Sequence, residues 1–174
     1  MEDRSMTLNP PTRSRTLAAV LAAVAITGAT VGAASAGAAT ISPAGTAFTA
    51  PGTIVVSTPA SFGVPVSCSI NLIGTTSADG SSASITDAKI SGSNRLCNLP
   101  QLKNLPWTLT PTSATTGEVS NVGFSLVGYN CGPATLAGSF DNMTNTLTST
   151  NQPMSGNCTV NSLSVQPNPA FTLS

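Results

Sequence analysis

The chain has 174 residues, of which only 7% are charged, and it contains six Lys and Arg, six Asp and Glu and no histidine, whereas an ordinary soluble domain carries roughly 25% charged residues. Zero net charge excludes a nucleic-acid-binding protein, which needs basic residues to neutralise phosphates. The lack of histidine excludes Ser-His-Asp and Cys-His catalysis as well as histidine-ligated zinc or haem.

The first 38 residues have the pattern of a secretory signal peptide. Arg4, Arg13 and Arg15 precede a wholly apolar run over residues 17–26, and small residues follow up to two A-x-A sites. A membrane anchor is the alternative, but beyond residue 26 the run continues with weakly apolar Thr, Gly, Ala and Ser. We therefore predict cleavage near Ala38, a secreted or cell-surface location, and one domain over residues 39–174.

Residues 39–174 show the periodicity of strands and none of helices. Short runs of β-branched and aromatic residues are separated by Gly, Pro, Asn and Asp. Their regular spacing predicts an all-β fold, an antiparallel β-sandwich with a barrel as the alternative. The expected strands cover residues 47–49, 53–57, 64–73, 82–91, 107–111, 119–127, 135–140, 146–149, 158–165 and 171–173.

The four cysteines all lie in the part predicted to be exported. An even number of cysteines in an oxidising compartment predicts two disulfides. Separations of 29, 34 and 27 positions lack the close C-x₂-C pairs that hold zinc or iron–sulfur clusters, so we expect no metal and no cofactor. Three pairings are possible, and a weak internal similarity (Cys, Leu-x-Gly, strand, Ser-Gly, Cys) favours Cys68–Cys97 and Cys131–Cys158.

A proline-punctuated stretch leads to the single tryptophan of the chain. In one interpretation this stretch connects two halves of the domain, and its apolar side chains cover an end of the core. In the other, it forms an exposed apolar ledge that contacts a lipid, a hydrocarbon or a glycan ring. The candidate contact residues are Leu99, Leu102, Leu105 and Trp107.

The carboxylates of residues 39–174 form no catalytic pattern. Asp79 and Asp141 fall in turns, Asp87 alternates with apolar neighbours, and Glu118 follows a glycine turn. A glycosidase needs two carboxylates across a cleft, and nothing in the spacing supports Glu118 with Asp141. A calcium loop is absent from the sequence as well. We therefore predict a protein that is not an enzyme.

The scarcity of charge predicts a protein that acts at a surface. Edge strands are normally protected by charge, especially by lysine, but residues 53–57 and 144–150 carry none. Little electrostatic repulsion then keeps copies of the chain apart. We expect adsorption to a hydrocarbon or lipid interface, or self-association through strand edges.

Several short motifs in residues 39–174 resemble those of a known family. They are residues 39–46 (ATISPAGT), Cys68 in an alternating strand, Ser91-Gly92 before Cys97, residues 104–108 (NLPWT), Cys131-Gly132-Pro133 and residues 155–158 (SGNC). Together they resemble the secreted bacterial protein activators of alkane oxidation, of the PraA/PraB type. The resemblance implies an exported protein that helps cells to grow on hydrocarbons by assisting contact with alkane or its emulsification, and it transfers no catalytic residue. The alternatives are a structural subunit of a fimbria or biofilm matrix, and a glycan-binding module that uses Trp107.

Overall fold

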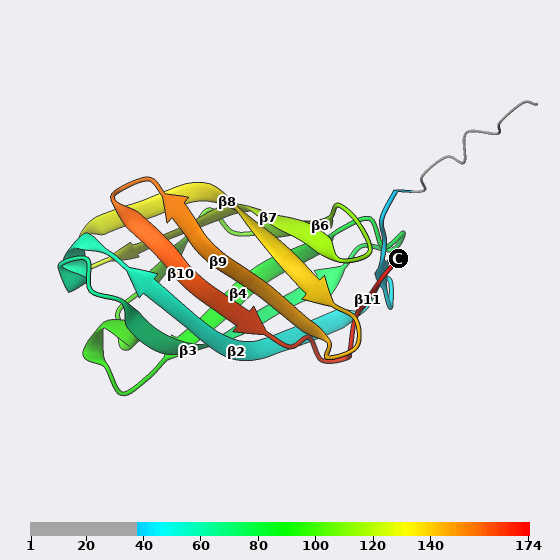
Figure 1. The fold of residues 1–174 in the computed structure, drawn as a ribbon, viewed down its shortest axis with the longest axis horizontal. Coiled ribbons are helices and arrows are strands. Elements are labelled where there is room, and N and C mark those ends of the chain that lie inside the picture. The colour runs from blue at the N-terminus through cyan, green and yellow to red at the C-terminus, as the bar shows by residue number, and fades with distance from the viewer. Residues whose placement is uncertain (1–37) are drawn as a thin grey trace, which may run out of the picture. The chain divides into compact units, whose positions relative to one another are not determined.

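A computed structural model describes residues 38–174, whose strands form a β-barrel (Figure 1). Apolar and polar residues alternate along these strands, and the apolar ones are buried inside the barrel. All but the last residue of the predicted signal peptide lies outside the described residues. The elements are β1 (Ile41–Ser42), β2 (Ala47–Ser57), η1 (Pro59–Ser61), β3 (Val66–Thr76), β4 (Ala83–Ser91), η2 (Arg95–Asn98), β5 (Gln101–Lys103), β6 (Trp107–Pro111), β7 (Thr116–Leu126), β8 (Tyr129–Asp141), β9 (Thr146–Met154), β10 (Cys158–Val165) and β11 (Thr172–Leu173).

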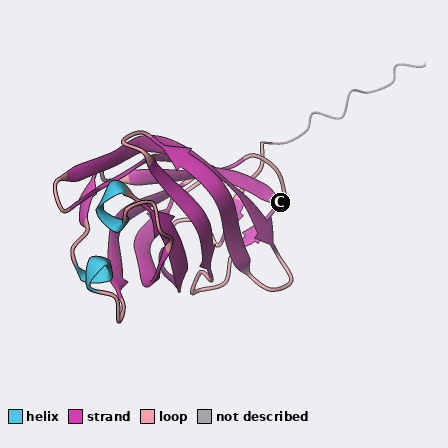
Figure 2. Ribbon diagram, turned by 60° about the vertical axis from the view of Figure 1, so that its left-hand side comes forward, coloured by secondary structure: helices cyan, strands magenta, loops and turns pink. Residues whose placement is uncertain are grey.

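The main sheet is an up-and-down meander that closes on itself. The strands follow the order β2-β3-β4-β6-β7-β8-β9-β10, all pairs are antiparallel, and β10 pairs back onto β2 to complete eight strands. The short β5 continues the line of β6 along β7. The all-β antiparallel fold is confirmed, and of the two predicted architectures the barrel is the one that forms (Figure 2).

Bulges in four strands explain why the sheet curls into a barrel. In β4, β7, β8 and β10 one extra residue interrupts the pairing with a neighbouring strand, and such a residue bends a strand and increases its twist. On both sides of each bulge the inward-facing residues stand three positions apart, where a regular strand would place them two apart. These pairs are Ile85 and Ala88 in β4, Val119 and Val122 in β7, Cys131 and Ala134 in β8, and Val160 and Leu163 in β10.

One end of the barrel, called the closed end here, is sealed by both termini of the described region. The strands β1 and β11 pair there, and Ile41 and Leu173 are buried. The ring of Phe171 packs edge-on against Phe48, with 4.9 Å between the ring centroids. The buried apolar contacts of these side chains close off the core at this end.

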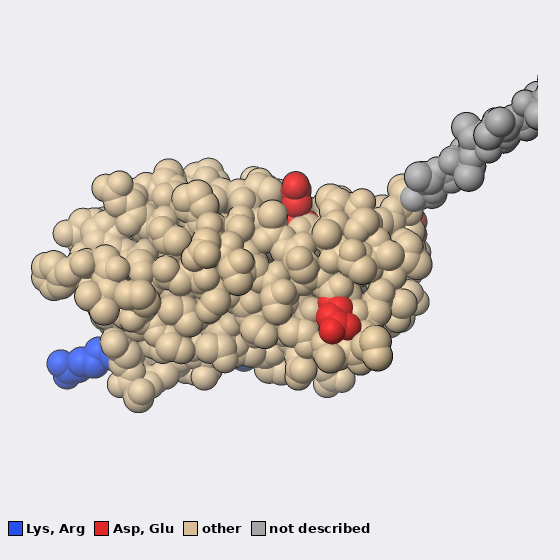
Figure 3. All heavy atoms as spheres, in the orientation of Figure 1, with Lys and Arg blue, Asp and Glu red and all other residues tan. Residues whose placement is uncertain are grey.

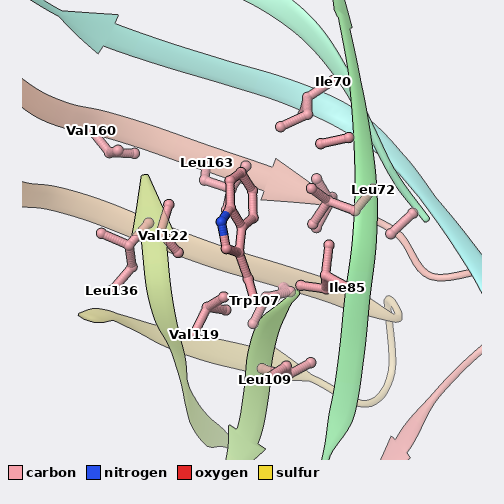
Figure 4. Packing of buried hydrophobic residues seen from close by; sticks show 14 of the residues in the cluster. Ile70, Leu72, Ile85, Trp107, Leu109, Val119, Val122, Leu136, Val160 and Leu163 are labelled. Carbon is pink, nitrogen blue, oxygen red and sulfur yellow. The ribbon is translucent and has the colours of Figure 1, made fainter. Parts of the chain in front are cut away.

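The middle of the barrel is filled by apolar side chains around Trp107 (Figure 4). Trp107 is only 5% exposed, and its indole Nε1 donates a hydrogen bond to the Lys103 carbonyl at 2.8 Å. A buried tryptophan needs such a partner for its N–H group. The structure therefore places Trp107 in the core, as the first of the two interpretations expects.

The opposite end, called the open end here, carries η1, η2 and both disulfides. Cys68 near the start of β3 is bonded to Cys97 in η2, and Cys131 near the start of β8 is bonded to Cys158 at the start of β10. The predicted pairing is confirmed. The two short helices lie near each other at this end (Figure 2). Here the disulfides hold the chain segments together, as the pairing of β1 with β11 does at the closed end.

Candidate functional site

Exposed apolar side chains gather on the loops of the open end. We call this set the apolar pole: Phe62 and Val64 follow η1, Leu99 follows η2, Val127 lies in the β7–β8 turn and Tyr129 directly follows that turn. Phe62 is 96% exposed and Val127 is 60% exposed. On the face drawn in Figure 3, this end, at the left, shows basic atoms and no acidic ones. Several exposed apolar side chains at one end of a barrel make that end a candidate interaction site.

The backbone at Phe62 and Val127 makes these two apolar residues more unusual. In the described part of the chain seven non-glycine residues have positive φ, and five of them are asparagine, the type that tolerates this conformation best. The other two are Phe62 (φ 54°) and Val127 (φ 50°). Val127 and Gly128 form a two-residue hairpin turn in which Asn-Gly is strongly preferred. Phe62 and Val127 thus place apolar side chains in water, at backbone positions where asparagine is the usual residue.

Backbone hydrogen bonds hold the η1 loop in a defined shape. The Phe62 amide donates to the Pro59 carbonyl, the Gly63 amide to the Thr58 carbonyl, and the Val64 amide to the Ser61 carbonyl, each at 3.0 Å. These bonds satisfy the carbonyls at the end of the short helix. The Phe62 ring is therefore presented to the outside by an ordered turn.

A cavity of about 60 Å³ lies beneath the apolar pole. It reaches from η1 and η2 to Trp107, and the atoms that line its open surface are apolar. Its volume corresponds to about two water molecules, and cavities lined only by apolar atoms stay dry. The lining residues are Ile54, Val56, Thr58, Ser61, Val66, Cys68, Ile70, Leu72, Ile85, Ile90, Leu96, Pro100, Leu102, Trp107, Val119, Val122, Phe124, Leu126, Leu136, Val160 and Leu163.

Thr58 beside this cavity carries a hydroxyl group without a partner. The side chain is 1% exposed, and its Oγ1 makes no hydrogen bond to the described residues. Its backbone is satisfied, because the Thr58 amide donates to Ser61 Oγ and its carbonyl accepts from the Ser61 and Gly63 amides. A buried unsatisfied hydroxyl costs about 1–3 kcal/mol.

We therefore expect Thr58→Val to raise the free energy of unfolding by about 1 kcal/mol, because a methyl group replaces the unsatisfied hydroxyl without a change of shape. The extended backbone at Thr58 (φ −140°, ψ 163°) suits a valine. Denaturant unfolding of the two proteins measures the difference. Thr58→Ser is the matched control, since it keeps the hydroxyl and loses the methyl and should be less stable. A valine variant less stable than the parent contradicts the prediction.

Comparison with known sequences places the chain in a family. A family described as alkane oxidation protein activator PraA/PraB-like matches residues 14–174, nearly the whole chain. The chain belongs to this family. The expected resemblance is confirmed, and the family description names an activator of alkane oxidation. No curated protein and no solved structure matches the chain.

The four candidate contact residues predicted for this PraA/PraB-like chain are divided between the surface and the interior. Leu99 is exposed and belongs to the apolar pole, and Leu105, in the β5–β6 loop, is exposed as well. Leu102 is half-buried and lines the cavity beside the buried Trp107. A glycan-binding site that stacks a sugar on Trp107 has no exposed ring to use.

Sequence reasoning missed the other members of the apolar pole. The sequence pattern predicts Val127 and Val64 at the ends of strands, because β-branched residues favour strands. It assigns Phe62 and Tyr129 to no element. The available signal was the dipeptides Phe62-Gly63 and Val127-Gly128, in which a large apolar residue stands where a turn favours asparagine.

The carboxylates in the turns of this PraA/PraB-like chain, Asp79 and Asp141, stabilise their turns by accepting hydrogen bonds from backbone amides. Hydrogen bonds from the Ser77 hydroxyl and from Ser81 lower the pKa of Asp79 to about 2. The Met143 and Thr144 amides, which donate to the carboxylate of Asp141, lower its pKa as well. In residues 38–174 no three Cys, Asp or Glu side chains come together as metal ligands, and no helix is long and apolar enough to cross a membrane.

Proposed function

We propose that this chain is a secreted, non-enzymatic protein that supports alkane oxidation by bringing its apolar pole into contact with hydrocarbon. The observation that carries the proposal is the exposure of Phe62 and Val127 on ordered turns where the backbone favours asparagine. Transfer of one such side chain from water to an apolar phase is favourable by about 1.5–3 kcal/mol. An apolar liquid therefore offers these residues an environment that water does not.

Export is supported by two features of the chain. The predicted signal peptide precedes the barrel, and the two disulfides belong to a kind of protein that matures in an oxidising compartment. A non-enzymatic role is supported by the family description, which names an activator, and by the turn-capping roles of Asp79 and Asp141. The contact with alkane would then take place outside the cell.

Self-association through strand edges has less support from the barrel. Residues 53–56 pair with β3 on one side and with β10 on the other. Within residues 144–150, Leu147 and Thr148 pair with both β8 and β10, whereas Ser149 and Thr150 pair with β10 alone. Because most backbone groups in the first segment and part of the second already have partners, they leave fewer free donors and acceptors for another copy of the chain than the sequence predicts. Contact through the apolar pole is the better-supported interaction.

Deletion of the gene tests the proposed function. We expect slower growth on n-hexadecane and unchanged growth on a soluble carbon source, because only the first requires contact with an apolar liquid. Complementation with the parent gene should restore growth on n-hexadecane. Equal deficits on both carbon sources, or no deficit on either, would overturn the proposal. Fractionation of the culture for the processed protein checks the predicted export separately.

A further inference from the structure

We propose that the cavity below the apolar pole holds the end of one unbranched saturated hydrocarbon chain. The inference rests on the proposed function, and it adds a binding site and a class of ligand to the surface contact. The chain would enter between η1 and η2 and extend toward Trp107 along the apolar lining. The part of the hydrocarbon that stays outside the barrel would lie against the apolar pole.

In two strands, β2 and β4, the inward-facing residues become less buried toward the open end, whereas those of β3, β7 and β10 stay buried. In β2 the inward residues Phe48 and Ala50 are buried, whereas Ile54 and Val56, nearer the open end, are only half-buried. In β4, Ile85 is fully buried and Ile90 is half-buried. An apolar, partly solvated mouth therefore leads into a packed interior, and a ligand that covers it removes apolar surface from water.

The size and chemistry of the cavity select the ligand. A volume of about 60 Å³ admits a few carbon atoms, so only the end of a chain fits without rearrangement. We expect an unbranched end, which has the smaller cross-section, to enter more readily than a branched one. The single unsatisfied polar atom of the lining residues, Thr58 Oγ1, has almost no accessible surface. Recognition is thus through apolar contacts, and a polar group on the ligand must stay outside, at the pole.

Trp107 provides a direct reporter, because it is the only tryptophan in the chain and lines the cavity. A bromoalkane whose chain enters the barrel brings bromine near the indole and quenches its fluorescence. We expect 1-bromooctane, used below its solubility limit, to quench Trp107 in a saturable manner. n-Octane should reverse the quenching, and its isomer 2,2,4-trimethylpentane should not. If octanoate also reverses the quenching, the site accepts the acyl chains of fatty acids as well as alkanes. If octanoate does not reverse it, the site is specific for free hydrocarbon.

A matched pair of variants in β2 locates the site. Val56 lines the cavity and its neighbour Val55 does not. Because phenylalanine at position 56 fills the mouth, Val56→Phe should weaken apparent binding of 1-bromooctane by about tenfold or more, while Val55→Phe should leave it within about twofold. Thermal unfolding confirms that each variant is folded, and Ile90→Phe replaces Val56→Phe if the latter does not fold.

Some results would overturn the cavity proposal and leave the proposed function standing. Quenching that does not saturate, equal displacement by the branched isomer, or equal binding by the Val56→Phe and Val55→Phe variants would show that the chain does not enter the barrel. Adsorption of the protein to an oil surface depends on the apolar pole and should survive Val56→Phe. A failure of the growth experiment, in contrast, removes the function whatever Trp107 reports.

Discussion

Replacement of Cys131 and Cys158 together by alanine is expected to lower the free energy of unfolding by roughly 3–4 kcal/mol. The bond joins positions separated by 27 residues, and its loss returns the entropy of that loop to the unfolded chain. It also connects β8 with β10 across β9, within the main core. Urea unfolding monitored by Trp107 fluorescence measures the change.

Cys68→Ala with Cys97→Ala is the matched control for this effect. Its loop is of similar length, with a separation of 29 residues, but it fastens η2 to β3 through a small separate cluster with Val66. We expect a similar loss of stability from chain entropy, together with greater exposure of η2 to protease. A loss below about 1 kcal/mol for the Cys131 and Cys158 pair would contradict the entropic account.

The second large effect concerns the apolar pole. Phe62→Asn combined with Val127→Asn should weaken adsorption to a hexadecane–water interface by roughly a hundredfold, because two exposed apolar side chains together contribute about 3 kcal/mol of transfer free energy. Asparagine tolerates positive φ, so the double variant should be at least as stable as the parent. Dynamic interfacial tension as a function of protein concentration measures the adsorption.

Met143→Asn is the control for the pole variant. Met143 is 96% exposed, as Phe62 is, but lies in the β8–β9 turn at the closed end. Its replacement removes a comparable apolar area and should leave adsorption unchanged within about twofold. Equal losses in Met143→Asn and in the pole variant would mean that general hydrophobicity, and no particular end of the barrel, drives adsorption.

Much of the fold follows from local pattern. The alternation around Phe124 in β7 and around Leu163 in β10 marks these strands, and the repeated Cys and Ser-Gly spacing led to the correct disulfides. β5 was missed because three residues with polar ends, Gln101–Lys103, carry too little pattern. Closure of the barrel depends on the pairing of β2 with β10, which lie over a hundred residues apart in the sequence. A pairing at this separation cannot be predicted from local sequence patterns.

The candidate site was harder to predict because it consists of exceptions to local rules. Val127 has the residue type of a strand and the backbone of a turn, and only its neighbour Gly128 hints at this. Leu99 and Leu102 are close in sequence, yet one faces solvent and the other faces the cavity. Leu99 follows η2, which the bond from Cys97 to Cys68 holds to β3, whereas Leu102 is positioned in β5 by its pairing with Phe124 of β7.

The position of both disulfides at the open end has a consequence for the proposed contact with hydrocarbon. Burial of apolar side chains stabilises a fold only while the surrounding solvent is water. In that contact, half-buried residues such as Ile54 and Leu96 would gain little free energy from staying inside the barrel. Covalent bonds do not depend on the medium. Cys68–Cys97 and Cys131–Cys158 would therefore hold together the end of the barrel whose hydrophobic packing the proposed contact weakens.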